Sequence, residues 1–197
     1  MNLPQSGLRI GWIAAGLLIV SLAVFAQGVR GKRIMRPVDG AAFASGEIEV
    51  LAAAPDGRLA LDGEVVSVES PFPNVLRAVL AAAPGEHVLS LTWDGGSDEV
   101  KFFVGDDHPE GYQAFRPHPP GIEVECTQCH SVSRRGRFRA SSAGCFDCHQ
   151  KDAFVEVHPH QPHVLERCGL CHNPHGSTSD DHLIAARDVV CTRCHNL

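Results

Sequence analysis

The amino-acid sequence predicts a mixed architecture in three parts: an N-terminal transmembrane helix, a small β-sandwich, and a C-terminal region of coil and short helices. Three observations lead to it. An uncharged apolar run lies near the N-terminus, short alternating apolar runs fill the middle, and the last part of the chain holds all eight cysteines and most of the prolines. The predicted boundaries are 1–36, 37–105 and 106–197.

The apolar run covers about residues 10–29 and has two interpretations. It is long enough to cross a bilayer as a helix, and Trp12 stands where an interfacial aromatic is expected. It also resembles a signal peptide, with Val24-Phe25-Ala26 as an acceptable cleavage site. We favour a retained anchor because the run is long for the apolar part of a signal peptide.

The middle of the chain predicts short β-strands because apolar and β-branched residues alternate between turn signals. The turns are Pro55-Asp56-Gly57, Asp62-Gly63 and Asp94-Gly95-Gly96. The expected strands, of which 75–80 is alternatively a short helical turn, are 47–51, 58–61, 64–68, 75–80, 87–93 and 99–104. Six short strands in so short a stretch indicate a β-sandwich.

Two details of this region resemble bacterial immunoglobulin-like modules: the turn at Leu61-Asp62-Gly63 and the lead-in to a strand from Pro84 to His87. The resemblance implies an immunoglobulin-like β-sandwich that serves as a spacer or as a docking surface for a partner. His87 precedes an apolar run. We therefore expect it to be a satisfied residue at a strand edge rather than a ligand.

The C-terminal part repeats the motif Cys-x-x-Cys-His four times and uses every cysteine of the chain. This spacing is the attachment signal for c-type haem. The two thiols add across the haem vinyl groups, and the histidine binds the iron from one face, so we expect four covalent haems. The predicted attachment sites are Cys126, Cys129, Cys145, Cys148, Cys168, Cys171, Cys191 and Cys194. The predicted proximal iron ligands are His130, His149, His172 and His195.

Two other interpretations fit the cysteine pairs less well. A zinc ribbon also uses Cys-x-x-Cys, but it does not need a histidine after every pair, and the chain has only 12 histidines in 197 residues. A disulfide scaffold does not need these histidines either, and two-residue loops make poor staples.

The motifs fall into two modules, 118–149 and 160–195. In each module a His-x-Pro sequence precedes the first cysteine at the same spacing, which indicates an internal duplication. The run Cys-Gly-Leu-Cys-His-Asn-Pro-His-Gly-Ser at 168–177, with its flanking elements, resembles the doubled-CxxCH multihaem cytochromes. In that family the histidine before the first motif and the histidine of Pro-His-Gly serve as distal ligands. The resemblance implies these roles for His160 and His175.

Ligand chemistry also favours histidine on both faces of each iron. The two methionines, Met1 and Met35, lie outside the haem region, so a Met-ligated, high-potential iron is not expected. The first module departs from the family pattern because Val132-Ser133 stands where Pro-His would fall. One distal ligand must therefore come from elsewhere. The predicted distal ligands are His118, His160, His175 and His158, with His163 and His182 as runners-up.

Two further features lie in the haem region. Residues 181–190 are the best helix candidate, and prolines break longer helices in the rest of the region. The run Arg134-Arg135-Gly136-Arg137-Phe138-Arg139 is the strongest cluster of charge. It could pair with haem propionates, dock an acidic redox partner, or form a solvated loop.

These features together predict electron transfer by a membrane-tethered periplasmic tetrahaem cytochrome, a carrier rather than an enzyme. It would relay electrons between a membrane complex and an extracytoplasmic acceptor. The expected partners are redox donor and acceptor proteins and the cytoplasmic membrane. Nucleic acid is not expected, because the net charge is −6 and no basic stretch is interleaved with aromatics. The alternatives are a subunit of a larger respiratory or photosynthetic assembly or of a cytochrome filament, and, less favoured, a multihaem reductase with an open distal site.

The charges around the apolar run oppose this location. Only Arg9 precedes the run, whereas Arg30, Lys32, Arg33 and Arg36 follow it, and this bias alone would place the body in the cytoplasm. Haem attachment to Cys-x-x-Cys-His resembles the c-type system, which works outside the cytoplasmic membrane in bacteria. We let the four motifs outweigh the charges. The expected location is the periplasmic face of the bacterial inner membrane with a single-pass anchor, or the periplasm after signal cleavage.

Overall fold

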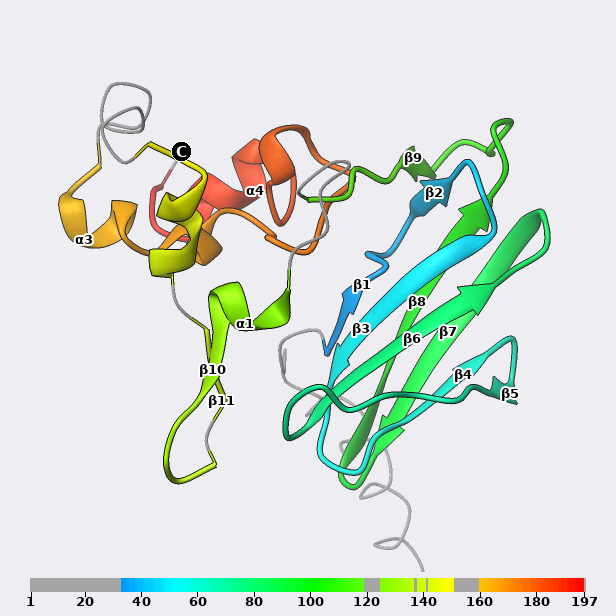
Figure 1. Ribbon diagram of the computed structural model, residues 1–197. Helices are drawn as coiled ribbons and strands as arrows, with labels where there is room; N and C mark the ends of the chain where they lie inside the picture. The colour runs from blue at the N-terminus through cyan, green and yellow to red at the C-terminus, as the bar shows by residue number, and fades with distance from the viewer. Residues whose placement is uncertain (1–32, 119–124, 137, 141, 151–159, 197) are drawn as a thin grey trace, which may run out of the picture. The chain divides into compact units, whose positions relative to one another are not determined.

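The computed structural model describes residues 33–118, 125–136, 138–140, 142–150 and 160–196 (Figure 1). The chain divides into two units, Met1–Gly31 and Lys32–Leu197. Every described residue belongs to the second unit. The regular structure of this unit is mostly β-sheet, followed by short helical turns and coil.

The strands before residue 115 form two sheets. The first sheet is antiparallel and has the order β1 (Ile34–Arg36), β3 (Glu47–Ala53), β6 (Val75–Ala81). The second sheet has the order β5 (Glu64–Val65), β4 (Arg58–Leu61), β7 (Gly85–Trp93), β8 (Gly96–Val104), β2 (Ala41–Phe43), β9 (Gln113–Ala114). Its pairs are antiparallel except that β2 runs parallel to both β8 and β9.

One apolar core joins the two sheets, which lie face to face in Figure 1. Side chains alternate along β3, so that Ile48 and Val50 are buried in this core while Glu49 is only half-buried on the other face. Leu89 and Phe102 fill the core from the second sheet. The period-two pattern of the sequence therefore sets which face of each strand is inside.

The sequence located six of these strands. β4 has the predicted bounds, and β3, β7 and β8 contain the predicted runs and extend beyond them. The ambiguous run 75–80 is a strand, whereas the run 64–68 pairs only over Glu64–Val65. Strands β1, β2 and β9 were not predicted, because two or three residues are too few to show alternation.

The described helices after residue 125 are one or two turns long. Those of α type are α1 (Cys126–Cys129), α3 (Pro162–Leu165) and α4 (Arg187–Thr192). The 3-10 turns are η1 (Ser142–Asp147), η2 (Cys168–Leu170) and η3 (Asp180–His182). A small hairpin joins β10 (His130–Val132) to β11 (Phe138–Ala140).

The helix predicted at 181–190 was wrong over its first half. Asp181 and His182 have positive φ angles of 54° and 53°, which no α-helix allows. The backbone there instead bonds to the preceding motif: the Asn173 N–H donates to the His182 carbonyl at 2.7 Å, and the Ile184 N–H donates to the Cys171 carbonyl at 2.9 Å. The helix begins only at Arg187.

The predicted fold class, a mixed architecture with a transmembrane helix, is corrected: the described chain is mostly β-sheet with few short helices. Prolines and tertiary hydrogen bonds limit each helix to a few residues. Among the described residues, none of the helices has the length and apolar character needed to span a bilayer. The predicted span at 10–29 lies outside the described residues.

His87 is held between two acceptors. Its Nδ1 lies 2.7 Å from Asp62 Oδ2, and its Nε2 lies 2.7 Å from the Ala83 carbonyl. Only the protonated imidazole can donate to both. Burial opposes protonation, but the two hydrogen bonds outweigh it and raise the pKa of His87. The expectation of a satisfied structural histidine is therefore confirmed.

We expect a pH-dependent contribution of this pair to folding. The raised pKa of His87 means that the stabilisation is complete below the ordinary value of 6.5 and is lost as pH rises through the folded-state pKa. On the acid side the stabilisation is lost as pH falls through the folded-state pKa of Asp62, which lies below the ordinary value of 3.8. Because Asp62 is half-exposed, the effect is below about 1 kcal/mol. Urea unfolding of His87→Gln and wild-type protein at pH 6 and pH 9 tests this: the two should differ more at pH 6.

Candidate functional site

All four Cys-x-x-Cys-His motifs adopt the same helical turn. In the first, the His130 N–H donates to the Cys126 carbonyl at the end of α1. In the other three, the histidine N–H donates to the carbonyl of the first cysteine at 2.9 Å. The turn brings both thiols and the histidine of a motif into one neighbourhood, which is what attachment to one porphyrin requires.

The thiols are not cross-linked. All eight cysteines are free thiols. Among the described residues there is also no cluster of three or more His, Cys, Asp or Glu side chains arranged to hold a metal ion by themselves.

The electrostatics of the thiols indicate that consecutive motifs are neighbours. Burial raises the pKa of Cys129, and the nearby Asp147 and Cys148 of the second motif raise it further. Burial and a side-chain contact with Cys168 raise the pKa of Cys145 to about 11. Burial also raises the pKa of Cys171, and the nearby Cys191 of the last motif raises it further. The attachment points therefore follow one another in the order of the sequence.

Three motif histidines face a second histidine. The ring centres of His130 and His175 are 5.9 Å apart with planes at 8°. Those of His118 and His149 are 6.0 Å apart at 11°, and those of His160 and His195 are 6.1 Å apart at 51°. A metal–imidazole bond is about 2 Å long and the ring centre lies roughly 1 Å beyond the nitrogen, so two imidazoles on one metal have centres about 6 Å apart. The three ring-centre separations therefore match the separation of two imidazoles on one metal.

The pairs follow the duplication. In each module the histidine of His-x-Pro faces the histidine of the second motif: His118 faces His149, and His160 faces His195. The first motif of module one is completed from module two, because His130 faces His175. The fourth predicted distal residue, His158, lies outside the described residues. Ligation itself stays a prediction for all of these histidines.

Backbone carbonyls orient two of the imidazoles. His172 Nδ1 lies 2.7 Å from the Asp181 carbonyl, and His118 Nδ1 lies 3.2 Å from the Pro174 carbonyl. Because a carbonyl only accepts, Nδ1 carries the proton in both rings. A proton on Nδ1 places the lone pair of each ring on Nε2, the arrangement in which a histidine binds a metal through Nε2.

The segment around His175 is held tightly. The Asn173 side chain accepts from the His175 N–H at 3.1 Å and donates to the Met35 carbonyl of β1 at 3.4 Å. Burial lowers the pKa of His175 to about 4, with repulsion from His130 and Arg36 adding to it. The ring is therefore neutral at physiological pH, the form that binds a metal.

The runners-up occupy other positions. His163 is exposed on α3. His182 packs edge-on against His118 with ring centres 5.1 Å apart, and its buried Nδ1 has no hydrogen-bond partner in the described part of the chain. Burial lowers the pKa of His182, and the neighbouring His118 and the motif histidine His172 lower it further.

Sequence reasoning missed an aromatic pair around His130. The Phe138 ring stacks on the His130 ring at 4.7 Å, and Phe72, from the loop before β6, packs on Phe138 at 5.2 Å. It also missed Arg36, Glu49 and Arg77 on the outer face of the first sheet, where Glu49 bridges the two arginines at 2.9 and 2.8 Å. A charged residue at the outward position of β3 was the available signal.

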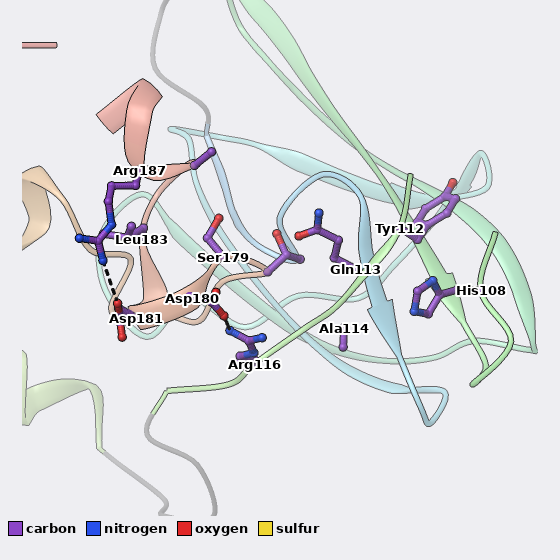
Figure 2. A pocket seen from close by; sticks show the side chains of 12 residues that line it. His108, Tyr112, Gln113, Ala114, Arg116, Ser179, Asp180, Asp181, Leu183 and Arg187 are labelled. Carbon is purple, nitrogen blue, oxygen red and sulfur yellow. Dashed lines mark hydrogen bonds and ion pairs between the residues drawn. The ribbon is translucent and has the colours of Figure 1, made fainter. Parts of the chain in front are cut away.

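A pocket of about 630 Å³ lies between residues 108–116 and 178–187 (Figure 2). Its charged side chains pair with one another: Arg116 with Asp180, and Arg187 with Asp181 at 3.5 Å. None of the predicted haem ligands that the structure describes lines this pocket. It is therefore separate from the histidine pairs.

Comparisons with known proteins agree with the second module. Residues 160–196 match the family model described as the doubled CXXCH motif, and this match supports a multihaem c-type cytochrome family. The CXXCH motifs indicate covalently bound c-type haem. No curated protein matches the chain.

Two solved structures are similar to part of the chain. The fibronectin(III)-like modules of CbhA from Clostridium thermocellum are 23% identical over 38% of this chain and 96% of theirs, with a TM-score of 0.32. An FMN-binding β-glucuronidase from Facaelibacterium prausnitzii is 22% identical over 36% of this chain and 11% of its own, with a TM-score of 0.31. Scores this low carry no argument, and the immunoglobulin-like assignment stays a prediction.

Proposed function

We propose that this chain is a tetrahaem c-type cytochrome that transfers electrons between redox proteins outside the cytoplasm. The observation that carries the proposal is the pairing of motif histidines with second histidines at about 6 Å, alongside four motifs that share one local geometry. When bound, each haem supplies a one-electron iron couple.

The residues divide the work. The cysteines fix each porphyrin, the motif histidines bind iron on one face, and His118, His160 and His175 bind it on the other, with His158 completing the fourth. Two histidines keep the iron six-coordinate in both oxidation states, so little rearrangement accompanies electron transfer. The succession of neighbouring motifs gives the electron a path through both modules.

The partners we propose are a donor and an acceptor protein, and the location we propose is the periplasm. The β10–β11 hairpin, which directly follows the first motif, exposes Arg134 and Arg135 at its tip and Arg139 on β11. A cluster of exposed arginines favours an acidic partner and speeds its encounter. In a bis-histidine haem both axial positions of the iron are filled, so no position is left for a substrate. This favours a carrier over an enzyme.

We expect the purified holoprotein to carry four covalent haems, because each motif has the same turn. Intact mass should exceed the polypeptide by about 2.5 kDa (four haems of ~0.62 kDa), and a pyridine haemochrome assay should give four haems per chain. The double variant Cys126→Ser/Cys129→Ser should lose one haem. A blank haemochrome assay, or a high-spin ferric EPR signal from the wild type, would overturn the proposal.

A further inference from the structure

On the outer face of the first sheet Glu49 binds both Arg36 and Arg77, and Arg77 also pairs with Glu69, with Nη1 3.7 Å from Oε2. Strand register puts Arg36 and Arg77 on either side of Leu51, and Glu49 lies on the same face of β3. Glu49 uses both oxygens: Oε2 accepts from Arg36 Nη1 at 2.9 Å, and Oε1 accepts from Arg77 Nε at 2.8 Å. Both oxygens of Glu49 are engaged, and Glu49 is the one carboxylate that pairs with Arg36 among the described residues, whereas Arg77 has Glu69 as well.

Arg36 is the member of this group with unused donors. Its side chain is only 18% exposed, and its buried Nε has no hydrogen-bond partner among the described residues. The guanidinium lies over the Phe115 ring, 5.1 Å from its centre. A buried guanidinium nitrogen without an acceptor is costly. The accessible edge of the guanidinium is where an anion can approach, and a charge-assisted hydrogen bond there would offset part of this cost.

The first haem site is the adjacent feature. Asn173 links the backbone of His175 to the carbonyl of Met35, the residue before Arg36. Arg36 is therefore one residue away from a direct contact with the segment that carries His175, the histidine that faces His130 of the first motif.

We propose that Arg36 binds a propionate of the haem attached at Cys126 and Cys129, and that its charge raises the reduction potential of that haem. This inference rests on the proposed function. A propionate carboxylate supplies two acceptors, which match the planar fork of a guanidinium. Positive charge near the iron disfavours the ferric state, which is the more positive one, and so favours reduction. The first sheet is then part of the redox site.

The test is a redox titration of the holoprotein, followed haem by haem by absorbance and EPR. In Arg36→Gln we expect one midpoint potential to fall, with about a tenfold change in the equilibrium constant for reduction, or ~59 mV for one electron. In Glu49→Gln the same midpoint should rise, because a negative charge is removed. Arg36→Lys should stay near the wild type. Arg58→Gln, on the exposed end of β4, is the matched control and should change no midpoint.

Because the two variants should shift the midpoint in opposite directions, the experiment distinguishes an effect of charge from an effect of packing. If Arg36→Gln and Glu49→Gln shift the midpoint in the same direction, or neither shifts it, the assignment is wrong. The shifted haem should be the one missing from Cys126→Ser/Cys129→Ser; a shift in another haem would also overturn it. If Arg36→Gln does not retain haem, Glu49→Gln decides alone. If the wild type carries four haems but the variants leave every midpoint unchanged, only this inference is refuted. If the wild type carries no haem, the proposed function is refuted as well.

Discussion

Replacing His175 by alanine is expected to convert one haem from low-spin to high-spin ferric iron. His175 faces His130 at 5.9 Å with nearly parallel rings, and no other described histidine ring is paired with His130. Removing the imidazole leaves that iron with five ligands or with a weak water ligand. EPR of the oxidised holoprotein should show one high-spin signal with three low-spin haems remaining, and added imidazole should restore the low-spin state.

His163→Ala is the matched control, because His163 is exposed on α3 and faces no motif histidine in the described structure. We expect it to leave all haems low-spin. His118→Ala and His160→Ala should each behave as His175→Ala does, for the haems of His149 and His195. A His175→Ala protein that remained fully low-spin would show that another residue binds the first iron.

The chemistry of the candidate site could be predicted because it is local. A Cys-x-x-Cys-His motif contains its own thiols and its own histidine within one turn, so spacing alone names these residues. The β-strands were predictable for the same reason: the alternation in Glu47–Ala53 is visible in seven consecutive residues.

The pairing of histidines could not be predicted, because it depends on tertiary structure. The gap left by Val132-Ser133 indicated that module one borrows a ligand, but the sequence did not identify His175 as its partner across the modules. The link from Asn173 to Met35 joins residues 138 positions apart, and no local pattern encodes it. The same holds for Arg36, whose neighbours are set by strand register.

Gly176→Ala should be a strongly destabilising change near the site. Gly176 has φ of +106°, and a Cβ there would lie 2.3 Å from Phe115 Cζ and 2.8 Å from the Arg116 carbonyl oxygen. Strained backbone costs about 1–2 kcal/mol and overpacking about 1–3 kcal/mol. We therefore expect the free energy of unfolding to fall by roughly 2–4 kcal/mol. Denaturant unfolding of the holoprotein measures it.

The clash should push the backbone at residue 176 away from Phe115 and so move the neighbouring His175. A fraction of the first haem should therefore become high-spin in Gly176→Ala. Gly169→Ala is the matched control, because Gly169 has no positive φ and its Cβ would meet no atom within 4 Å. Phe115→Ala in the Gly176→Ala background should recover part of the loss, since it removes the closest clash, and a double-mutant cycle quantifies that coupling. Equal stability of the two alanine variants would mean that the close approach of Gly176 to Phe115 does not hold the His175 segment in place.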